Sequence, residues 1–312
     1  MLWGVALLFI TSAVIFLIFY ILPSADPAVL RAGRNAGPQQ IAVIRHSLGL
    51  DKPIYEQFWL YMKNVFLHFD FGYSYQYNVP VRQLIFSRLP ATIWLVTGAV
   101  IIWLAIGIPT GIVSAIKRRS LLDRTMMVSS LALISAPVFW LGLVLLYLFA
   151  QDVGRFPVFP GQGSFATATT IPEKAGSMIL PWIVLAAATA AIYARYMRSS
   201  MIDVMAEDYI RTARAKGVTE SAVVLRHGAR SAITPIVTLL GLDIGTLLAG
   251  NAILTETVFN IPGVGRLLFT SIERSDLTTI QGIVLFGAFF IILFNLIVDI
   301  AYAYLDPRVR YR

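Results

Sequence analysis

The sequence predicts an all-α, polytopic membrane protein with six transmembrane helices. Its 312 residues have a mean hydropathy of +0.74, and only 13% of them are charged, about half the share found in soluble domains. A transmembrane helix needs about 20 mostly apolar residues to cross about 30 Å of hydrocarbon. Six apolar runs meet or approach that length, at 2–23, 89–116, 125–150, 179–194, 236–254 and 277–305.

The runs differ in how they begin and in the charges they carry. We interpret 2–23 as a retained first span, because it lacks a basic start and exceeds the apolar length of about 7–15 residues in a signal peptide. The short fourth run is expected to extend toward Met201, with Arg195 and Arg198 snorkelling to the membrane interface. Asp243 lies inside the fifth run and Asp299 near the end of the sixth.

The connections between the runs contain both helical and turn-like segments. In the first, PQQIAVIRHSLGL and PIYEQFWLYMKNVFLHF have apolar residues at helical spacing and predict two short amphipathic helices, followed by the turn-like DFGYSY. These helices either cover the span ends or form a docking surface outside the membrane. GRFPVFPGQG predicts a loop, and ETVFNIPGVGRLLFTSIERSD predicts a Pro-Gly turn followed by a short amphipathic stretch.

Lysine and arginine are distributed unevenly over the short connections. Four lie at 117–124, seven at 195–230 and three in the tail after 307, whereas the third and fifth connections hold two each. Because short cytoplasmic loops carry the excess of positive charge, this distribution predicts that both termini and the segment 199–235 face the cytoplasm. It also argues against nucleic acid as a partner, since no basic soluble domain is present.

The sequence offers little for catalysis. The absence of cysteine excludes disulfides, thiolate metal sites and a cysteine nucleophile, and no metal cluster or catalytic pair of carboxylates stands out. There is no Walker-type phosphate loop, so the chain is not expected to hydrolyse ATP by itself. Asp243 leaves one alternative open, a self-contained secondary carrier or channel that uses this carboxylate.

The longest polar stretch, DYIRTARAKGVTESAVVLRHGARSAITP, runs over 208–235. The residues 199–216 favour a helix, with Glu207 and Arg211 at i, i+4. Gly217 is expected to end that helix in a left-handed conformation, and Thr219 to cap a second helix. The stretch is therefore a helix, a glycine corner and a helix, either a coupling element or a plain hairpin between the fourth and fifth spans.

This stretch resembles the EAA loop of binding-protein-dependent ABC importers, whose signature is Glu-Ala-Ala, three residues and Gly. Counting back from Gly217 gives Arg211, Thr212 and Ala213 at the first three positions, of which only Ala213 matches strictly. DYIRTARAKG followed by HGAR is similar to the dipeptide/oligopeptide branch. LGLDKP, FDFGYSY, RLPAT, SAPVFWLGL, LLAGNAILTETVFNIPGVGRLL and LDPRVRY also fit that branch, most closely its B-type membrane subunit.

The resemblance implies a type I ABC importer (MetI-like) permease fold in the bacterial inner membrane. It divides the chain into a first span and outer loop at 1–88, a five-span core at 89–306 containing the coupling loop at about 199–235, and a cytoplasmic tail at 307–312. The implied partners are a second homologous permease, two cytoplasmic ATPases, an extracytoplasmic substrate-binding protein and membrane lipid. No cofactor is expected in this chain, because the ATPases bind ATP and Mg²⁺.

The resemblance also implies which residues act. The coupling loop that seats on an ATPase would consist of Glu207, Asp208, Arg211, Thr212, Ala213, Arg214, Ala215, Lys216, Gly217, Val218, Thr219 and Glu220. Asp243 and Asn251 are candidates for the translocation path. The outer docking loop for the binding protein would contain Asn260, Pro262, Gly263 and Gly265. The sequence leaves the cargo open among dipeptides, oligopeptides, nickel chelates, glutathione, haem and sugars.

Overall fold

A computed structural model describes residues 2–18, 28–29, 37–47, 49–74 and 76–305. In these residues the regular structure is helical apart from one short antiparallel pair of strands. The first part of the chain forms α1 (Leu2–Phe16), α3 (Pro38–Ser47), α4 (Ile54–His68), β1 (Tyr73–Ser74), β2 (Val79–Pro80), α5 (Val81–Ile116), α6 (Leu121–Ser135), α7 (Val138–Phe149) and α8 (Ser164–Thr167).

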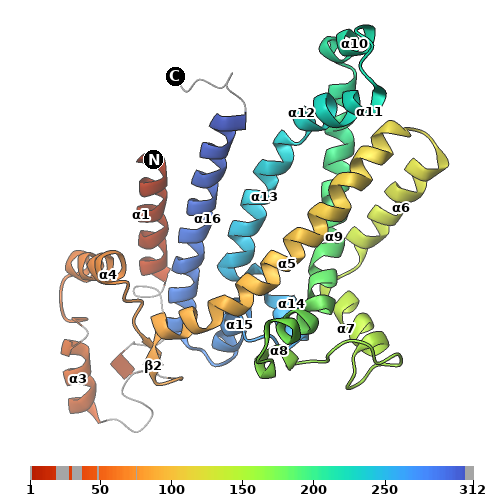
Figure 1. Ribbon diagram of the computed structural model, residues 1–312. Helices are drawn as coiled ribbons and strands as arrows, with labels where there is room; N and C mark the ends of the chain where they lie inside the picture. Colours follow the sequence, from red (N-terminus) through yellow and green to blue (C-terminus); the bar gives the residue numbers. More distant parts are fainter. Residues whose placement is uncertain (1, 19–27, 30–36, 48, 75, 306–312) are drawn as a thin grey trace.

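The second part continues the helical arrangement (Figure 1). It forms α9 (Ile171–Met205), α10 (Asp208–Ala215), α11 (Glu220–Ala222), the π-helix η2 (Val223–Ala229), α12 (Arg230–Ala232), α13 (Thr234–Thr246), the π-helix η3 (Leu247–Asn251), α14 (Ile253–Val258), α15 (Val264–Glu273) and α16 (Leu277–Leu305). We refer to the end of the molecule that carries α10 as the α10 end, and to the opposite end as the α15 end.

Four helical segments in the described residues are long and apolar enough to cross a membrane: Val81–Ile116, Ile171–Met205, Thr234–Asn251 and Leu277–Ile300. The run expected at 125–150 is not one continuous helix, because α6 and α7 meet at a bend of 99°. Pro137 explains the bend, since proline holds the preceding residue, Ala136, in an extended conformation. The first expected span lies partly outside the described residues, and its described helix α1 has 15 residues.

The core of the bundle is the contact between α5 and α9, which run alongside each other (Figure 1). Gly107 and Gly111, four residues apart on α5, let the two backbones approach closely. A Cβ atom at Gly111 would lie 2.6 Å from the carbonyl oxygen of Ala194, so only glycine fits there. Trp103 of α5 and Tyr193 of α9 are fully buried beside each other, with ring centroids 5.8 Å apart.

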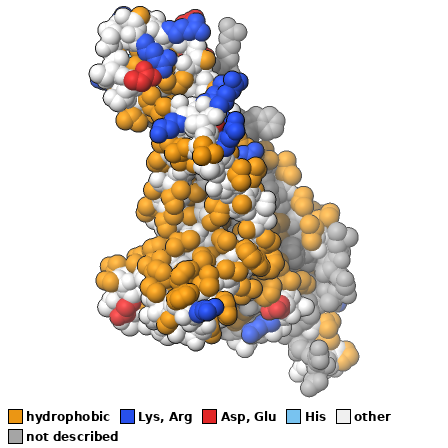
Figure 2. All heavy atoms as spheres, turned by 90° about the vertical axis from the view of Figure 1, so that its right-hand side faces the viewer, with side chains coloured by type: hydrophobic (Ala, Val, Ile, Leu, Met, Phe, Trp, Pro, Cys, Tyr) orange, Lys and Arg blue, Asp and Glu red, His pale blue; other side chains and the backbone are white. Residues whose placement is uncertain are grey.

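The outer surface of the bundle is apolar between two charged ends. Figure 2 shows a broad hydrophobic band on one side of the molecule, with lysine, arginine and acidic side chains gathered above and below it. Large apolar side chains are exposed along several helices, including Ile101, Leu131 and Leu143. Such a surface is unfavourable in water and suits a lipid environment.

The two amphipathic helices expected in the first connection are confirmed as α3 and α4. The turn-like DFGYSY that follows them is tied to the start of α16. Ser74, which is fully buried, donates a hydrogen bond to the carboxylate of Asp276, and Thr279 Oγ1 donates to the same oxygen at 2.7 Å. This buried contact holds the first connection against the α15 end of the bundle.

Candidate functional site

The glycine corner forms as the sequence predicts, and it has the geometry of a Schellman motif. Gly217 is left-handed, with φ +75°. Its N–H donates to the carbonyl oxygen of Arg214 at 2.9 Å, and the N–H of Val218 donates to that of Ala213 at 3.2 Å. These two bonds satisfy carbonyl groups that the end of α10 would otherwise leave unpaired.

The prediction of one continuous helix over 199–216 is wrong, because the helix is interrupted once. The long helix α9 ends at Met205, and Glu207 adopts an extended conformation, φ −68° and ψ 150°, before α10 begins at Asp208. This break lets α10 leave the direction of α9 (Figure 1). Ile210, which is fully buried, anchors α10 to the rest of the molecule.

The charges at the corner pair differently from the prediction. Arg211 Nη1 lies 3.3 Å from Asp208 Oδ1 instead of pairing with Glu207. The guanidinium of Arg214 donates two hydrogen bonds to the carboxylate of Glu220, at 3.1 and 2.7 Å, and so closes the corner from one helix to the next. Hydrogen bonding from Arg214 lowers the pKa of the Glu220 carboxyl below its ordinary value.

The corner is an exposed surface. Thr212, Ala215, Lys216 and Thr219 are exposed together with the charged residues, while Ala213 and Val218 are half-buried. A Cβ atom placed on Gly217 would meet no atom within 4 Å. Thr219 stands at the expected cap position, but its side chain makes no capping hydrogen bond. The corner therefore presents a shaped, polar surface that the described residues of this chain leave uncovered.

The return from the corner packs against the end of α9. The second helix restarts where the sequence predicts but continues as the π-helix η2. Gly228 of η2 has no room for a side chain, since a Cβ there would lie 2.9 Å from the sulfur of Met205. Ser200 Oγ of α9 also donates to the carbonyl oxygen of Ala232 at 2.9 Å. The corner thus projects from a base in which both flanking helices are fixed.

A half-buried ion pair completes this base. Arg198 of α9 donates to both carboxylate oxygens of Asp123 at the start of α6, at 2.7 and 2.9 Å, and Ser114 of α5 donates to the same carboxylate. The sequence predicts that Arg198 snorkels to the interface but does not predict this partner, Asp123, in the first turn of α6. Asp123 is the single acid within the basic connection KRRSLLDR, and this position could have indicated an acidic partner for an arginine.

The two candidates for the translocation path lie on the candidate span Thr234–Asn251. Asp243 of α13 accepts a hydrogen bond from the hydroxyl of Tyr193 at 2.8 Å, which joins α13 to α9. Asn251 is exposed at the end of η3, next to Gly250 with φ +102°. Asp243 therefore has a structural partner, and Asn251 lies at a kink of the span.

The turn between α14 and α15 is built around a buried carboxylate that the sequence analysis did not assign a role. Glu256 of α14 is fully buried. Its carboxylate accepts from Thr92 Oγ1 at 2.7 Å and from the N–H of Arg266, in the first turn of α15, at 2.8 Å. Thr92 Oγ1 in turn accepts from the N–H of Val264 at 2.9 Å. Burial raises the pKa of the Glu256 carboxyl to about 7.

Two of the four residues predicted for the outer docking loop serve this packing. A Cβ atom on Gly263 would lie 2.2 Å from the Glu256 carboxyl group, and one on Gly265 would lie 2.6 Å from the carbonyl oxygen of Gly250. Both glycines are buried, while Asn260 is exposed and Pro262 is half-buried. A partner at this turn would therefore meet Asn260 and Pro262 rather than the two glycines.

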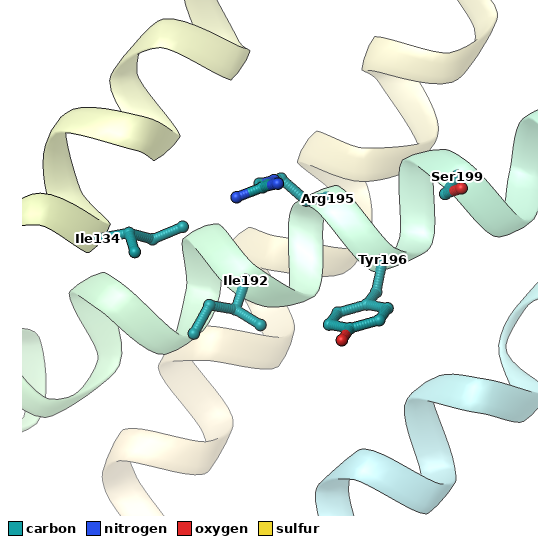
Figure 3. Close-up of a pocket in the computed structure, with 5 residues that line it drawn as sticks. All are labelled: Ile134, Ile192, Arg195, Tyr196 and Ser199. Atoms are coloured by element: carbon teal, nitrogen blue, oxygen red, sulfur yellow. The ribbon is translucent and has the colours of Figure 1, made fainter.

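A hollow of about 530 Å³ opens between α6 and α9. Ile134 of α6 forms one wall, and Ile192, Arg195, Tyr196 and Ser199 lie along one face of α9 (Figure 3). Arg195 was expected at the membrane interface, and this hollow was not predicted from the sequence. The signal was the spacing of Arg195, Tyr196 and Ser199, which places these three polar side chains on one face of a helix.

Comparison with known proteins assigns the class of protein to which this fold and corner belong. The model "Binding-protein-dependent transport system inner membrane component" matches residues 107–311, and "Binding-prot-dependent transport system membrane comp, N-term" matches residues 1–96. The chain belongs to this family. It is an inner-membrane permease subunit of an ABC importer, which decides against the secondary carrier or channel.

Similar proteins extend over almost the whole chain. The glutathione transport system permease protein GsiC of Escherichia coli (strain K12) is 43% identical over 305 residues, covering 98% of this chain and 95% of the relative. GsiC of Shigella dysenteriae serotype 1 shows the same identity and coverage. GsiC of Shigella boydii serotype 4 is 42% identical over the same length.

Proposed function

We propose that this permease pairs with a second, homologous permease to enclose a path for small anionic peptides, with glutathione as the first candidate cargo. A binding protein would deliver the cargo at the α15 end, and two ATPases at the α10 end would supply the energy. This orientation rests on the excess of lysine and arginine in the connections of the α10 end. Glutathione is the cargo named for relatives that are 43% identical to this chain.

The exposed corner at Gly217 is the single observation that carries the ATPase contact. Its backbone is fixed by the Schellman motif and its base by buried contacts, so a force applied to the corner would reach α9 and α13. Closure of the ATPases on ATP would move two such corners, one from each permease. The candidate spans would then change between two arrangements, biased by a nucleotide bound elsewhere.

Asp243 has a different role in this proposal. Its carboxylate accepts from Tyr193 and thereby joins α13 to α9. We expect it to keep these helices together during the change of arrangement rather than to carry protons. Asn251 and the exposed part of the α14–α15 turn, Asn260 with Pro262, remain our candidates for the path and for the contact with the binding protein.

The assembly is tested by purifying the tagged chain from its host in mild detergent and identifying bound proteins by mass spectrometry. We expect a second permease and two ATPases. Recovery of the chain alone would contradict the proposal. Uptake of radiolabelled glutathione by proteoliposomes containing the purified complex, binding protein and ATP then tests the cargo, and ATP-dependent uptake is the expected result.

A further inference from the structure

We infer that the face of α9 formed by Ile192, Arg195, Tyr196 and Ser199 is a cargo-contact site that holds a carboxylate of the transported peptide. This inference deepens the proposed function and rests on it. The cargo class is therefore an anionic peptide, recognised inside the membrane part of the importer as well as by the binding protein.

The spacing of these residues makes them a single face of the helix. Positions 192, 195, 196 and 199 follow the i, i+3, i+4, i+7 pattern, so their side chains lie on one side of α9. The intervening Tyr193, Ala194 and Met197 are buried toward the core, where α9 packs on α5. Figure 3 shows the open face turned away from α5, with Ile134 of α6 at one side.

The size of the hollow suits a small ligand. Its volume of about 530 Å³ falls within the range of about 300–1,000 Å³ that small-molecule sites occupy. The apolar walls come from Ile134 and Ile192, and Arg195, Tyr196 and Ser199 supply the polar groups. A tripeptide could place its carboxylate against Arg195 and its remaining atoms against the isoleucines.

The guanidinium of Arg195 has no acidic side chain as a partner in the described part of the chain. Arg198, three residues further, is held by Asp123, and Arg214 is held by Glu220. No ion pair or hydrogen bond is formed there by the side chains of Arg195, Tyr196 or Ser199. A cation within a membrane-spanning helix is costly unless it faces a water-filled path or an opposite charge, so this arrangement points to an anionic ligand.

The chemistry of the three polar groups fits a carboxylate. The planar guanidinium of Arg195 can donate two parallel hydrogen bonds to the two oxygens of one carboxylate. The hydroxyls of Tyr196 and Ser199 can donate further bonds from the same face. A phosphate group of a membrane lipid shares this chemistry, and the experiment separates the two sources.

The test uses the complete importer in proteoliposomes with saturating, glutathione-loaded binding protein. The variant Arg195→Gln removes the charge, Arg195→Lys retains it, and Arg124→Gln removes an exposed arginine of α6 that lies outside the hollow. We expect Arg195→Gln to lower glutathione uptake per ATP hydrolysed by about tenfold or more, since it deletes a charge-assisted pair. Arg195→Lys should lose less, and Arg124→Gln should match the unmodified importer.

Hydrolysis of ATP stimulated by the loaded binding protein is measured on the same samples and should stay near the unmodified rate for all three variants. This readout separates a lost cargo contact from a failure of folding or assembly. Unchanged uptake per ATP in Arg195→Gln contradicts the inference. A loss that appears only with anionic lipid and is shared by Arg124→Gln assigns the ligand to a lipid headgroup and also overturns it.

Failure of the proposed cargo has a different signature. If the unmodified importer takes up no glutathione, the proposed cargo is wrong, and the inference that rests on it falls too. If the unmodified importer takes up glutathione and Arg195→Gln does so equally well, only the inference is contradicted.

Discussion

Two glycine-containing turns join candidate spans at opposite ends of this permease, and they use glycine for opposite reasons. Gly217 at the α10 end needs a left-handed backbone but has open space around it. Gly265 at the α15 end has an ordinary backbone but no room for a side chain, because the carbonyl oxygen of Gly250 lies 2.6 Å from where its Cβ would be. Glycine is required at position 217 by the backbone conformation and at position 265 by the close packing.

The carboxylates at the two turns differ in the same way. Glu256 is buried and receives hydrogen bonds from Thr92 and from the backbone of α15. Glu220 is exposed and paired only with Arg214. The α15 turn satisfies the carboxylate of Glu256 within the chain, whereas the α10 corner presents a fixed shape whose contacts are left to another protein. The α15 turn is therefore suited to internal stability, and the α10 corner is suited to contact with a partner.

The ion pair between Asp123 and Arg198 lies at the α10 end, yet Asp123 is buried and Arg198 is only one quarter exposed. Asp123→Ala should have the largest effect on the unfolding free energy, although below the roughly 3–5 kcal/mol of a fully buried pair, because the arginine that loses its partner is one quarter exposed. Denaturant unfolding in detergent measures the loss. The double variant with Arg198→Met should lose less than Asp123→Ala alone, and an equal or greater loss would contradict this explanation.

A close-packed glycine should come second. Gly265→Ala forces a Cβ against the carbonyl oxygen of Gly250 and should lower the unfolding free energy by about 1–3 kcal/mol. Gly176→Ala is the matched control, since a Cβ at Gly176 meets nothing within 4 Å. The two variants are compared by the same unfolding assay. Equal stability of both would show that the α15 turn is not closely packed.

Glu256 should make the stability depend on pH. Burial raises its pKa from 4.5 to about 7, so the unfolded chain ionises first as the pH rises. Its contribution is therefore complete below pH 4.5 and is lost as the pH rises through about 7. Glu256→Gln should remove this part of the pH dependence when unfolding is measured from pH 4.5 to 8. An unaltered pH profile in the variant would contradict the assignment.

The smallest effect on stability is expected for Glu220→Gln. The pair with Arg214 is exposed, and exposed pairs contribute little. Because Arg214 lowers the pKa of Glu220, the pair's contribution is present above the ordinary pKa and is lost as the pH falls through the lowered value. We expect the same thermal midpoint as the unmodified protein at neutral pH. A clearly lower thermal midpoint of Glu220→Gln at neutral pH would contradict the proposed difference between the two turns.

The features that could be predicted from the sequence are those that depend on residues close together in the chain. Apolar spacing predicted α3 and α4, and a glycine after a polar helix predicted the left-handed corner at Gly217. Contacts between distant segments were not predictable in this way. The partner of Arg198 is 75 residues away on another helix, and the glycines of the α15 turn face groups that only the folded chain brings near.

Errors within the polar stretch have a related cause. The break at Glu207 and the pairing of Arg211 with Asp208 depend on how α10 is anchored through Ile210, which propensity does not express. The bend between α6 and α7 was not predicted either: the run 125–150 was expected as one span although it contains Pro137, and the angle between the two helices depends on the helices they pack against.

The central claim, that the Gly217 corner transmits ATP-driven movement to the spans, is tested most directly by Gly217→Val in the complete importer. A β-branched residue in the left-handed region costs roughly 1–2 kcal/mol or more and should distort the corner without changing the packed base. We expect uptake per ATP hydrolysed to fall by about tenfold, which corresponds to about 1.4 kcal/mol, while the chain still reaches the membrane and Gly176→Val remains normal. Unchanged uptake per ATP in Gly217→Val would contradict the account.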